Sequence, residues 1–465
     1  MQLYSHEMRG WIHPADAFVT LYGSDENAFW LDRENHWNPY SVMGHAYGNK
    51  TTSTVEMFKA LAERKVWNSD TLESAPRVAP RTPANLPFAY RPGFVGWLDY
   101  QQDPLSQPNS VNQEASGTWL EVREALVFDH AAKSIFFVGY FETEDQFQHW
   151  LQAALLRLSL CGGQQISYRM RNAPKGPSMP VSLAHSDAAY LELIAQAQRH
   201  IALGDVYQLC LTNQIQLSHQ SDPLEVFLRL RDSNPAPYAA FIRAGEQALV
   251  CSSPEQFLSL SARGKLSTRP IKGTRPRHAD PIIDAEFAAE LAQNLKERAE
   301  NLMIVDLMRN DLGRVSEPNS VTVTELFKVE PYATVHQLVS TVESQLAPGF
   351  GLQDVLNAAF PGGSMTGAPK IRAMQLINQL EGVPRGVYSG AAGHIGIDGS
   401  ADLGMVIRSL LFSGQQDSPT KRVSIGVGGG ITIDSDPAAE LEETKLKASA
   451  LLAVLGSPDP WSAPS

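Results

Sequence analysis

Hydrophobic residues recur along the chain with two different periods, and these periods outline the predicted elements. The run VYQLCLTNQIQL (206–217) alternates, which places Gln208, Cys210 and Thr212 on one face of a strand. Further strand-like runs are AAFIRA, ALVCSS, QFLSLSA, GAAGHIGI, LGMVIRSLLF and RVSIGVGGGITI. Stretches with helical periodicity separate these groups, so the pattern favours an α+β fold with mainly antiparallel sheets over alternating βαβ units.

End signals and apolar stripes mark three predicted helices. Ser186 is a suitable N-cap for the stretch that follows it, and Gly204 is placed to end that helix. An apolar stripe predicts a second helix over 282–312. The stretch 434–455 predicts a third helix, with Asp436 as its N-cap.

A change in composition along the chain suggests a domain boundary. Residues 68–118 are rich in Pro, Ser, Asn and Gln around one apolar island at 88–100, and 172–186 has the composition of a linker. The expected divisions are an N-terminal domain at 1–180, a second domain at 186–455 and a short tail at 456–465.

Charge and cysteine content exclude some classes of function. The formal net charge is −12, which argues against nucleic-acid binding because the phosphate backbone favours a basic surface. The three cysteines are far apart and lack zinc-ligand spacing, which is typical of a reducing compartment. The chain starts without a signal-peptide pattern, and no apolar run approaches the roughly 20 residues of a membrane span. We therefore expect a cytoplasmic protein that binds neither nucleic acid nor membrane.

Two pairs of carboxylates repeat one spacing. Glu297 and Glu300 share a face of one predicted helix, and Glu440 and Glu443 share a face of another. If the two helices face each other, the four carboxylates form an oxygen-rich cage suited to Mg²⁺, since no His or Cys accompanies them. Spacing alone leaves a second interpretation open, in which both pairs are solvated helix faces.

Two glycine-rich stretches resemble nucleotide-binding loops but fail in detail. FPGGSMTGAPK has Gly362 and Gly367 at P-loop spacing, yet Ala368 stands at the lysine position and Lys370 comes too late. GVGGGI ends in Ile431 where a dinucleotide motif requires glycine. Both stretches allow close approach of a small anionic ligand, and tight turns without a ligand explain them equally well.

The order of the motifs resembles that of the chorismate-utilising enzymes. From about 186 to 455 the chain contains GDVYQLCLTN, NPAPYAAF, CSSPEQF, RPIKGTRPR, KERAENLMIVDLMRNDLGRV, VHQLVST, FPGGSMTGAPKIRAM, YSGAAGHIG, IRSL and GGGITIDSDPAAELEETKLKA. The N-terminal third resembles the family's tryptophan-binding domain through FWLDRENHWNPYSVMG and FVGWLDY. The resemblance implies two large, mainly antiparallel sheets packed as a sandwich with helices outside.

Two positions separate reactions within this family. Lys272, in PIKGT, stands where anthranilate synthase large subunits usually have alanine, and a lysine there is typical of members that form 4-amino-4-deoxychorismate, the precursor of 4-aminobenzoate and folate. Gln208 stands where isochorismate and salicylate synthases have a water-activating lysine, so the resemblance favours addition of ammonia. Two alternatives stay open: an anthranilate-forming enzyme that releases pyruvate, and a non-catalytic protein that binds chorismate or tryptophan.

The resemblance assigns two catalytic residues. Glu255 would be the general acid for loss of the C4 hydroxyl of chorismate, which requires a pKa raised from about 4.3. Lys272 would attack C2 and form an adduct that ammonia then displaces. A free lysine with a pKa of about 10.4 gives up its proton at pH 7 at a cost of about 4.6 kcal/mol. Mg²⁺ or Arg269, Arg275 and Arg277 could favour that loss.

Metal and substrate positions follow from the same resemblance. Glu300 and Glu443 correspond to the Mg²⁺ ligands, with Glu297 and Glu440 as supporting carboxylates. His336 could equally be a core histidine. The substrate-binding positions are Gln208, Thr274, His336, Ser364, Thr366, Tyr388, Arg408, Gly428 and Gly430.

The resemblance also implies a second ligand and a partner. Asp32 stands where the family's tryptophan pocket often has serine, and its carboxylate could accept the tryptophan ammonium group; whether tryptophan binds is left open. The motif G-x-C-x-G of a fused amidotransferase is absent, so we expect a separate glutamine amidotransferase subunit that supplies ammonia. The predicted tryptophan-pocket residues are Asp32, Tyr40, Ser41, Val42, Met43, Pro237, Tyr238 and Ala239.

Overall fold

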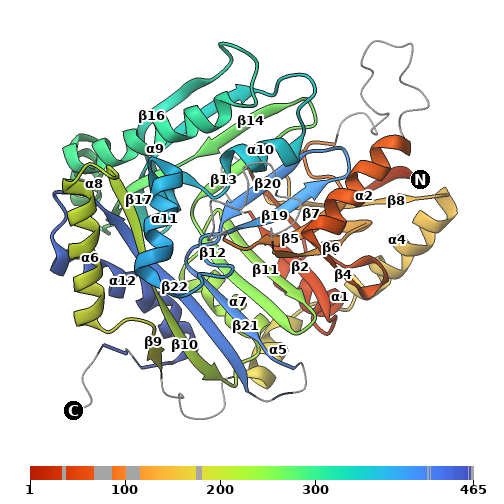
Figure 1. Ribbon diagram of the computed structural model, residues 1–465. Helices are drawn as coiled ribbons and strands as arrows, with labels where there is room; N and C mark the ends of the chain where they lie inside the picture. Colours follow the sequence, from red (N-terminus) through yellow and green to blue (C-terminus); the bar gives the residue numbers. More distant parts are fainter. Residues whose placement is uncertain are drawn as a thin grey trace.

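Two antiparallel sheets with helices on their outer sides form the protein (Figure 1). The computed structural model describes residues 1–33, 38–67, 86–100, 116–173, 181–415, 418, 420–458 and 460–461. Residues 34–37, 68–85, 101–115, 174–180 and 462–465 lie outside the described residues. They include parts of the Pro-rich stretch, the linker and the C-terminal tail that the sequence predicts.

The first sheet has 12 strands within the described residues, and it contains strands from both ends of the chain. Its path is β1 (Gln2–Arg9), β8 (Ser134–Phe141), β7 (Glu124–Asp129), β3 (Tyr40–His45), β2 (Asn27–Asp32), β11 (Tyr238–Ala244), β12 (Gln247–Ser253), β21 (Ser409–Ser413), β22 (Lys421–Ile431), β10 (Gln208–His219) and β18 (Gly367–Ala368), with β9 (Ser182–Leu183) beside β10.

The second sheet has 10 strands within the same residues. Its path is β15 (Ile271–Pro276), β17 (Val335–Gln345), β14 (Lys265–Arg269), β13 (Gln256–Leu260), β20 (Ala401–Met405), β19 (Ala391–Gly396), β5 (Gly93–Leu98), β6 (Gly117–Glu121) and β4 (Thr51–Ser53), with β16 (Thr322–Pro331) beside β17. The apolar island at 88–100 thus supplies β5.

Helices cover the outer faces of the two sheets (Figure 1). They are α1 (Pro14–Tyr22), α2 (Thr54–Trp67), α4 (Glu144–Leu158), α5 (Gln164–Asn172), α6 (Asp187–Ala202), α7 (Pro223–Ser233), α8 (Pro281–Gln293), α9 (Leu295–Gly313), α10 (Leu352–Ala359), α11 (Lys370–Glu381) and α12 (Pro437–Leu455), with single 3₁₀ turns η1 (Tyr47–Asn49) and η3 (Gly363–Met365).

Alternation along β2 explains how the sheets pack. Phe29 and Leu31 lie in a core that also contains Val95 and Trp97 of the second sheet. The intervening residue Trp30 lies instead in a core made with the outer helices. Every residue of β2 is buried because both faces of the first sheet are covered. The predicted sandwich of two antiparallel sheets is therefore confirmed.

Two predicted elements are each divided in the structure. The run LGMVIRSLLF forms β20 and β21, which belong to different sheets; β20 ends at Met405, and Arg408, with a φ of 50°, directly precedes β21. The predicted helix 282–312 is α8 and α9, because Asn294 is extended between them. Apolar periodicity is insensitive to such a single residue.

Other predictions of local structure are confirmed. The Ser186 side chain accepts a hydrogen bond from the amide of Ala189 and caps α6, and Asp436 caps α12 in the same way. The division at residue 180 stays a prediction; both sheets contain strands from either side of it. In the ranges that the structure describes, no helix combines the length and the apolar character needed to cross a membrane.

Candidate active site

Segments far apart in the sequence meet around the amine of Lys272. The Lys272 Nζ lies 3.9 Å from Glu300 Oε2 on α9. It also lies beside Gly430 of β22, where an added Cβ atom would be 2.8 Å from the amine. The same Cβ atom would overlap the amide of Gln208 on β10. Glycine at position 430 therefore leaves room for the amine and the amide to lie side by side.

Gln208 has hydrogen-bonding capacity that the protein does not use. Its side chain is 1% exposed, and neither its Nε2 nor its Oε1 has a partner. A buried polar group left unpaired costs about 1–3 kcal/mol. Such a group beside the Lys272 amine indicates a position that is built to contact a ligand.

Glu255 lies close enough to Lys272 to be influenced by its charge, and the pKa of its carboxyl is raised. The carboxyl follows β12, is 5% exposed and receives a hydrogen bond from Ser364. Burial raises its pKa to about 7, although the Ser364 hydrogen bond and the charge of Lys272 act in the opposite direction. A carboxyl with this pKa can donate a proton near neutral pH.

The three arginines around Lys272 are all paired with carboxylates. Their charges are thus offset locally, and this weakens the expectation that they favour loss of the Lys272 proton. The pairs are Arg269 with Glu330 (2.6 Å), Arg275 with Glu290 (2.6 Å) and Arg277 with Asp284 (2.9 Å).

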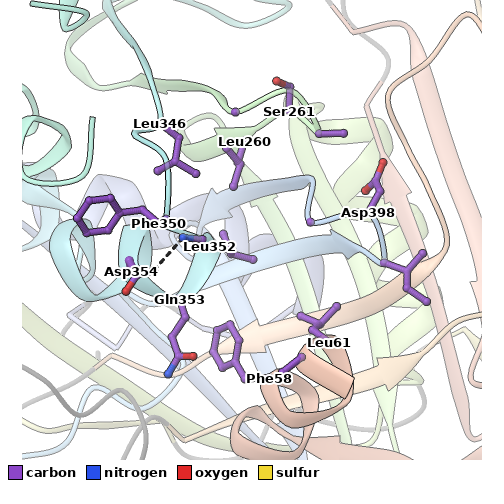
Figure 2. A pocket seen from close by; sticks show the side chains of 17 residues that line it. Phe58, Leu61, Leu260, Ser261, Leu346, Phe350, Leu352, Gln353, Asp354 and Asp398 are labelled. Atoms are coloured by element: carbon purple, nitrogen blue, oxygen red, sulfur yellow. Dashed lines mark hydrogen bonds between the residues drawn. The ribbon is translucent and has the colours of Figure 1, made fainter. Parts of the chain in front are cut away.

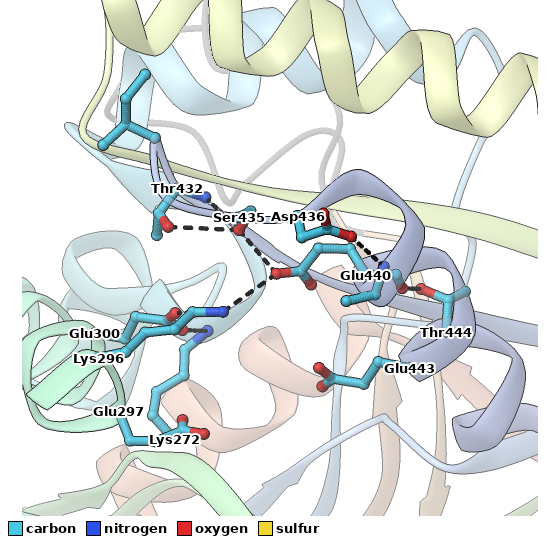
Figure 3. A network of polar contacts seen from close by, with 12 residues as sticks. Lys272, Lys296, Glu297, Glu300, Thr432, Ser435, Asp436, Glu440, Glu443 and Thr444 are labelled. Carbon is cyan, nitrogen blue, oxygen red and sulfur yellow. Dashed lines mark hydrogen bonds and ion pairs between the residues drawn. The ribbon is translucent and has the colours of Figure 1, made fainter. Parts of the chain in front are cut away.

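The four predicted metal ligands lie on α9 and α12, but they are not equivalent (Figure 3). Glu300 and Glu440 are buried, and the Lys296 amine lies between them. Glu297 pairs with Arg275 at 3.3 Å. Among the residues that the structure describes, no three acidic, His or Cys side chains are grouped closely enough to form a metal site as they stand. The four side chains offer only carboxylate oxygens, the ligand type that a hard divalent cation prefers, and Lys296 occupies the space between two of them.

Glu443 is the exposed member of this set. Its side chain is largely exposed and pairs with Lys447 at 2.8 Å, four residues along α12. Figure 3 shows it apart from Glu300 and Glu440. The same Lys447 amine donates to the carbonyl of Gly428 at 2.8 Å, so it ties α12 to the predicted substrate-binding glycines of β22.

Arg408 provides a cation without a carboxylate partner among the described residues. Burial lowers the pKa of its guanidinium, and no acidic side chain in the described ranges lies within ion-pair distance. A guanidinium suits a bidentate contact with a ligand carboxylate.

The ring of Tyr388 packs onto Gly426, where any side chain would collide with it.

The remaining predicted substrate residues differ in how they are used. His336 Nε2 lies 2.9 Å from Asp284 Oδ1 and its ring is buried. The Thr366 hydroxyl donates to the carbonyls of Gly362 and Gly363, so it braces its own loop. Thr274 is exposed on β15. The roles assigned to these residues stay predictions.

The side chains that hold the glycine-rich loop were not predicted from the sequence. Lys370, rejected as a P-loop lysine, donates to the carbonyls of Ala359 and Pro361 and pairs with Asp311 at 2.6 Å. Lys370 lies two residues after the lysine position of a P-loop, and this offset was the only indication in the sequence that it has another role. Lys296 and Lys447, each four residues before or after a predicted metal ligand, were also missed.

The predicted tryptophan-pocket residues come together on three neighbouring strands, except Pro237, which directly precedes β11. Ala239 of β11 pairs directly with Asp32 of β2, and β3, which carries Tyr40–Met43, is the next strand. The Asp32 carboxylate accepts from the Ser41 hydroxyl at 2.8 Å and from Arg231 at 2.6 Å. Asp32, Arg231 and Pro237 line a cavity of about 310 Å³. Asp32 already has a cationic partner, and tryptophan binding stays a prediction.

A second cavity lies away from these sites (Figure 2). It has a volume of about 380 Å³ and lies between α2, the β13–β14 turn, the segment before α10 and the β19–β20 turn. Its walls include Phe58, Leu260, Phe350 and Leu352, and none of the predicted site residues lines it within the described part of the chain.

Fold and site together define an α+β protein of two packed sheets, with a buried acid, an amine and paired carboxylates at one place. The chain belongs to the chorismate binding enzyme family, whose model matches residues 26–453.

Three relatives illustrate this similarity. The chain is 40% identical to the aminodeoxychorismate synthase of Streptomyces griseus over 461 residues, which is 96% of this chain and 63% of that protein. It is 34% identical to anthranilate synthase component 1 of Streptomyces coelicolor over 95% of this chain and 86% of that protein. Anthranilate synthase component I of Streptococcus pneumoniae has a solved structure with a TM-score of 0.68 and 27% identity, covering 82% of this chain and 86% of that chain.

Proposed function

We propose that this protein converts chorismate and ammonia to 4-amino-4-deoxychorismate. The observation that carries the proposal is Glu255, a buried carboxyl whose pKa is raised to about 7 within the electrostatic influence of Lys272. The name of the Streptomyces griseus relative supports the same reaction. Lys272 stands where anthranilate synthases usually have alanine, and Gln208 stands where isochorismate and salicylate synthases have a lysine. Both residues therefore favour 4-amino-4-deoxychorismate over the products of those enzymes.

The reaction replaces one group at C4 of chorismate. The deprotonated Lys272 amine forms a bond to C2, the two conjugated ring double bonds shift, and the C4–O bond breaks while Glu255 gives its proton to the departing hydroxyl, which leaves as water. Ammonia then bonds to C4, the two double bonds shift back, and the C2–N bond to Lys272 breaks. Ammonia loses one proton in the second step, and this proton restores the acid form of Glu255.

A divalent cation and an arginine would hold the substrate. Glu300, Glu440, Glu443 and Glu297 would supply the oxygen ligands of Mg²⁺, and the bound ion would offset the charge of the ring carboxylate. The side chain of Arg408 has no acidic partner among the described residues and suits a carboxylate of the substrate.

The proposal includes a partner subunit, a location and a division of the chain. A glutamine amidotransferase would supply ammonia; the words "component 1" in the name of the Streptomyces coelicolor relative support a second component. All three cysteines are free, which supports a cytoplasmic location. Residues 1–180 would form the domain with the tryptophan pocket, and 186–455 the catalytic domain.

Product analysis tests the proposal directly. Purified protein is incubated with chorismate, Mg²⁺ and ammonium, and pyruvate and aminated products are measured. We expect 4-amino-4-deoxychorismate without pyruvate. Anthranilate with equimolar pyruvate would instead favour the activity in the name of the Streptomyces coelicolor relative. Absence of any turnover would favour a binding protein.

A further inference from the structure

Lys296 lies between the two buried carboxylates of the site, which belong to different helices. Its Nζ is 3.9 Å from Glu300 Oε1, four residues along α9, and 3.5 Å from Glu440 Oε1 on α12. Figure 3 shows the amine reaching across the gap between these helices. Lys296 is therefore a cationic bridge between α9 and α12.

The bridge offsets a repulsion that the fold creates. Glu300 is 8% exposed and Glu440 is 6% exposed, so water screens their charges poorly. The Lys296 side chain is 50% exposed, and its flexible stem starts in the first turn of α9. The amine thus reaches the carboxylates from the solvent side, and it can return to water without rearrangement of the core.

An independent feature marks this place as a ligand site. The fully buried amide of Gln208 has no partner on either atom and lies beside Lys272, whose amine in turn contacts Glu300. This unpaired amide belongs to β10, so it is an observation separate from the acidic spacing on α9 and α12. The carboxylates therefore form one wall of a site that is built to contact a ligand, and they are not merely a solvated acidic cluster.

We propose that Lys296 is a built-in counter-ion that a divalent cation displaces from Glu300 and Glu440. It joins α9 to α12 in the absence of the cation and competes with the cation for the same oxygens. On binding, the two lysine–carboxylate contacts are exchanged for cation–carboxylate contacts, and the amine moves into water. This role rests on the proposed function, which supplies the need for the cation.

Titration with Mg²⁺ alone tests the competition. The full chain and its Lys296→Met variant are titrated calorimetrically without chorismate, and their melting temperatures are measured with and without Mg²⁺. Partly exposed ion pairs are weak, so we expect Mg²⁺ to bind about two- to tenfold more tightly to the variant. Without Mg²⁺, we expect the variant to melt at a lower temperature than the parent. On addition of Mg²⁺, its melting temperature should rise more than that of the parent.

Two further variants separate competition from general charge effects. Lys296→Arg keeps a cation and should bind Mg²⁺ no more tightly than the parent. Lys445 also joins two helices, through Asp187 of α6 at 2.9 Å, but it contacts none of the four site carboxylates. Lys445→Met should therefore lower the melting temperature and leave Mg²⁺ affinity unchanged.

Three results would overturn the proposed role of Lys296. These are equal or weaker Mg²⁺ binding by Lys296→Met, equal tightening in Lys445→Met, and no Mg²⁺ binding by either the parent or Lys296→Met. The titration contains no chorismate and measures no turnover. A different reaction product would therefore leave its outcome unchanged, so failure of this role and failure of the proposed reaction are distinguishable.

Discussion

Glu255 shows how burial alone can prepare a carboxyl for acid catalysis. Its pKa of about 7 follows mainly from loss of contact with water, since its hydrogen bond from Ser364 and the charge of Lys272 both oppose the shift. About half of the molecules therefore carry the acid form near pH 7. The sequence predicted which residue needed a raised pKa, but burial of Glu255 depends on segments far from it in the chain.

This raised pKa should be visible in stability. A carboxyl with a pKa of 4.5 in the unfolded chain and about 7 in the folded protein contributes stability below pH 4.5 and loses it as the pH rises through 7. Glutamine cannot ionise, so Glu255→Gln does not lose this stability. As the pH rises from 5 to 8, the free energy of unfolding of the variant should therefore increase by about 2–3 kcal/mol relative to that of the parent. Calorimetric melting at four pH values measures this difference.

The exposed Glu317 provides the control for this comparison. Glu317→Gln should follow the parent at every pH. Melting temperatures of Glu255→Gln and the parent that change in parallel with pH would contradict the burial argument.

At the scale of elements, the break between α8 and α9 positions the carboxylates. The Asn294 side chain accepts from the amide of Glu297 at 3.1 Å and so starts α9 one residue after α8 has ended. The new helix carries Lys296, Glu297 and Glu300 in its first two turns. Short-range signals predicted the caps of α6 and α12, but the apolar stripe over 282–312 concealed this break.

Removal of this cap should weaken both the helix and the site. Asn294→Ala should cost about 1 kcal/mol of stability and should also raise the dissociation constant for chorismate with Mg²⁺, because the first turn of α9 frays. Thermal melting and binding titration measure the two effects.

The N-cap of the neighbouring helix is the matched control. Asp280 accepts from the amide of Ile282 at 2.8 Å and caps α8. Asp280→Ala should lose comparable stability with unchanged chorismate affinity. Equal loss of affinity in both variants would contradict a specific role for the start of α9.

At the scale of the whole molecule, one buried ion pair joins parts of both sheets. Arg385 pairs with Glu381 at 2.6 Å and donates to the carbonyls of Met365 in η3 and Cys210 in β10. Its guanidinium also lies 4.5 Å from the centre of the Tyr100 ring, just after β5 of the second sheet. Arg385 thereby connects β10 of the first sheet, the η3 turn and the end of β5 in the second sheet.

Loss of the carboxylate should destabilise the whole protein. Glu381→Gln leaves the buried Arg385 charge uncompensated, at an expected cost of about 3–5 kcal/mol. Thermal melting measures it. Glu192 pairs with Arg199 at 2.8 Å on the exposed face of α6, and Glu192→Gln should cost less than about 1 kcal/mol. Similar melting temperatures for the two variants would contradict this difference.

Long-range pairing limits what the sequence could predict about the site. The strands around Gln208 and Gly430 were recognised from alternation, yet their contact depends on the antiparallel register of β10 with β22, more than two hundred residues apart in the chain. The family resemblance supplied the candidate residues. The bridging by Lys296 and the pairing of each arginine near Lys272 depend on side-chain positions that no local pattern determines.

The proposed reaction requires that Lys272 becomes covalently bonded to the substrate. The protein is mixed with chorismate and Mg²⁺ without ammonia, quenched in acid, digested and analysed by mass spectrometry, with Lys272→Ala as the control. The peptide containing Lys272 should gain the mass of chorismate minus one water, and the control should gain none. An unmodified Lys272 peptide from protein that turns over chorismate when ammonium is added would contradict the account.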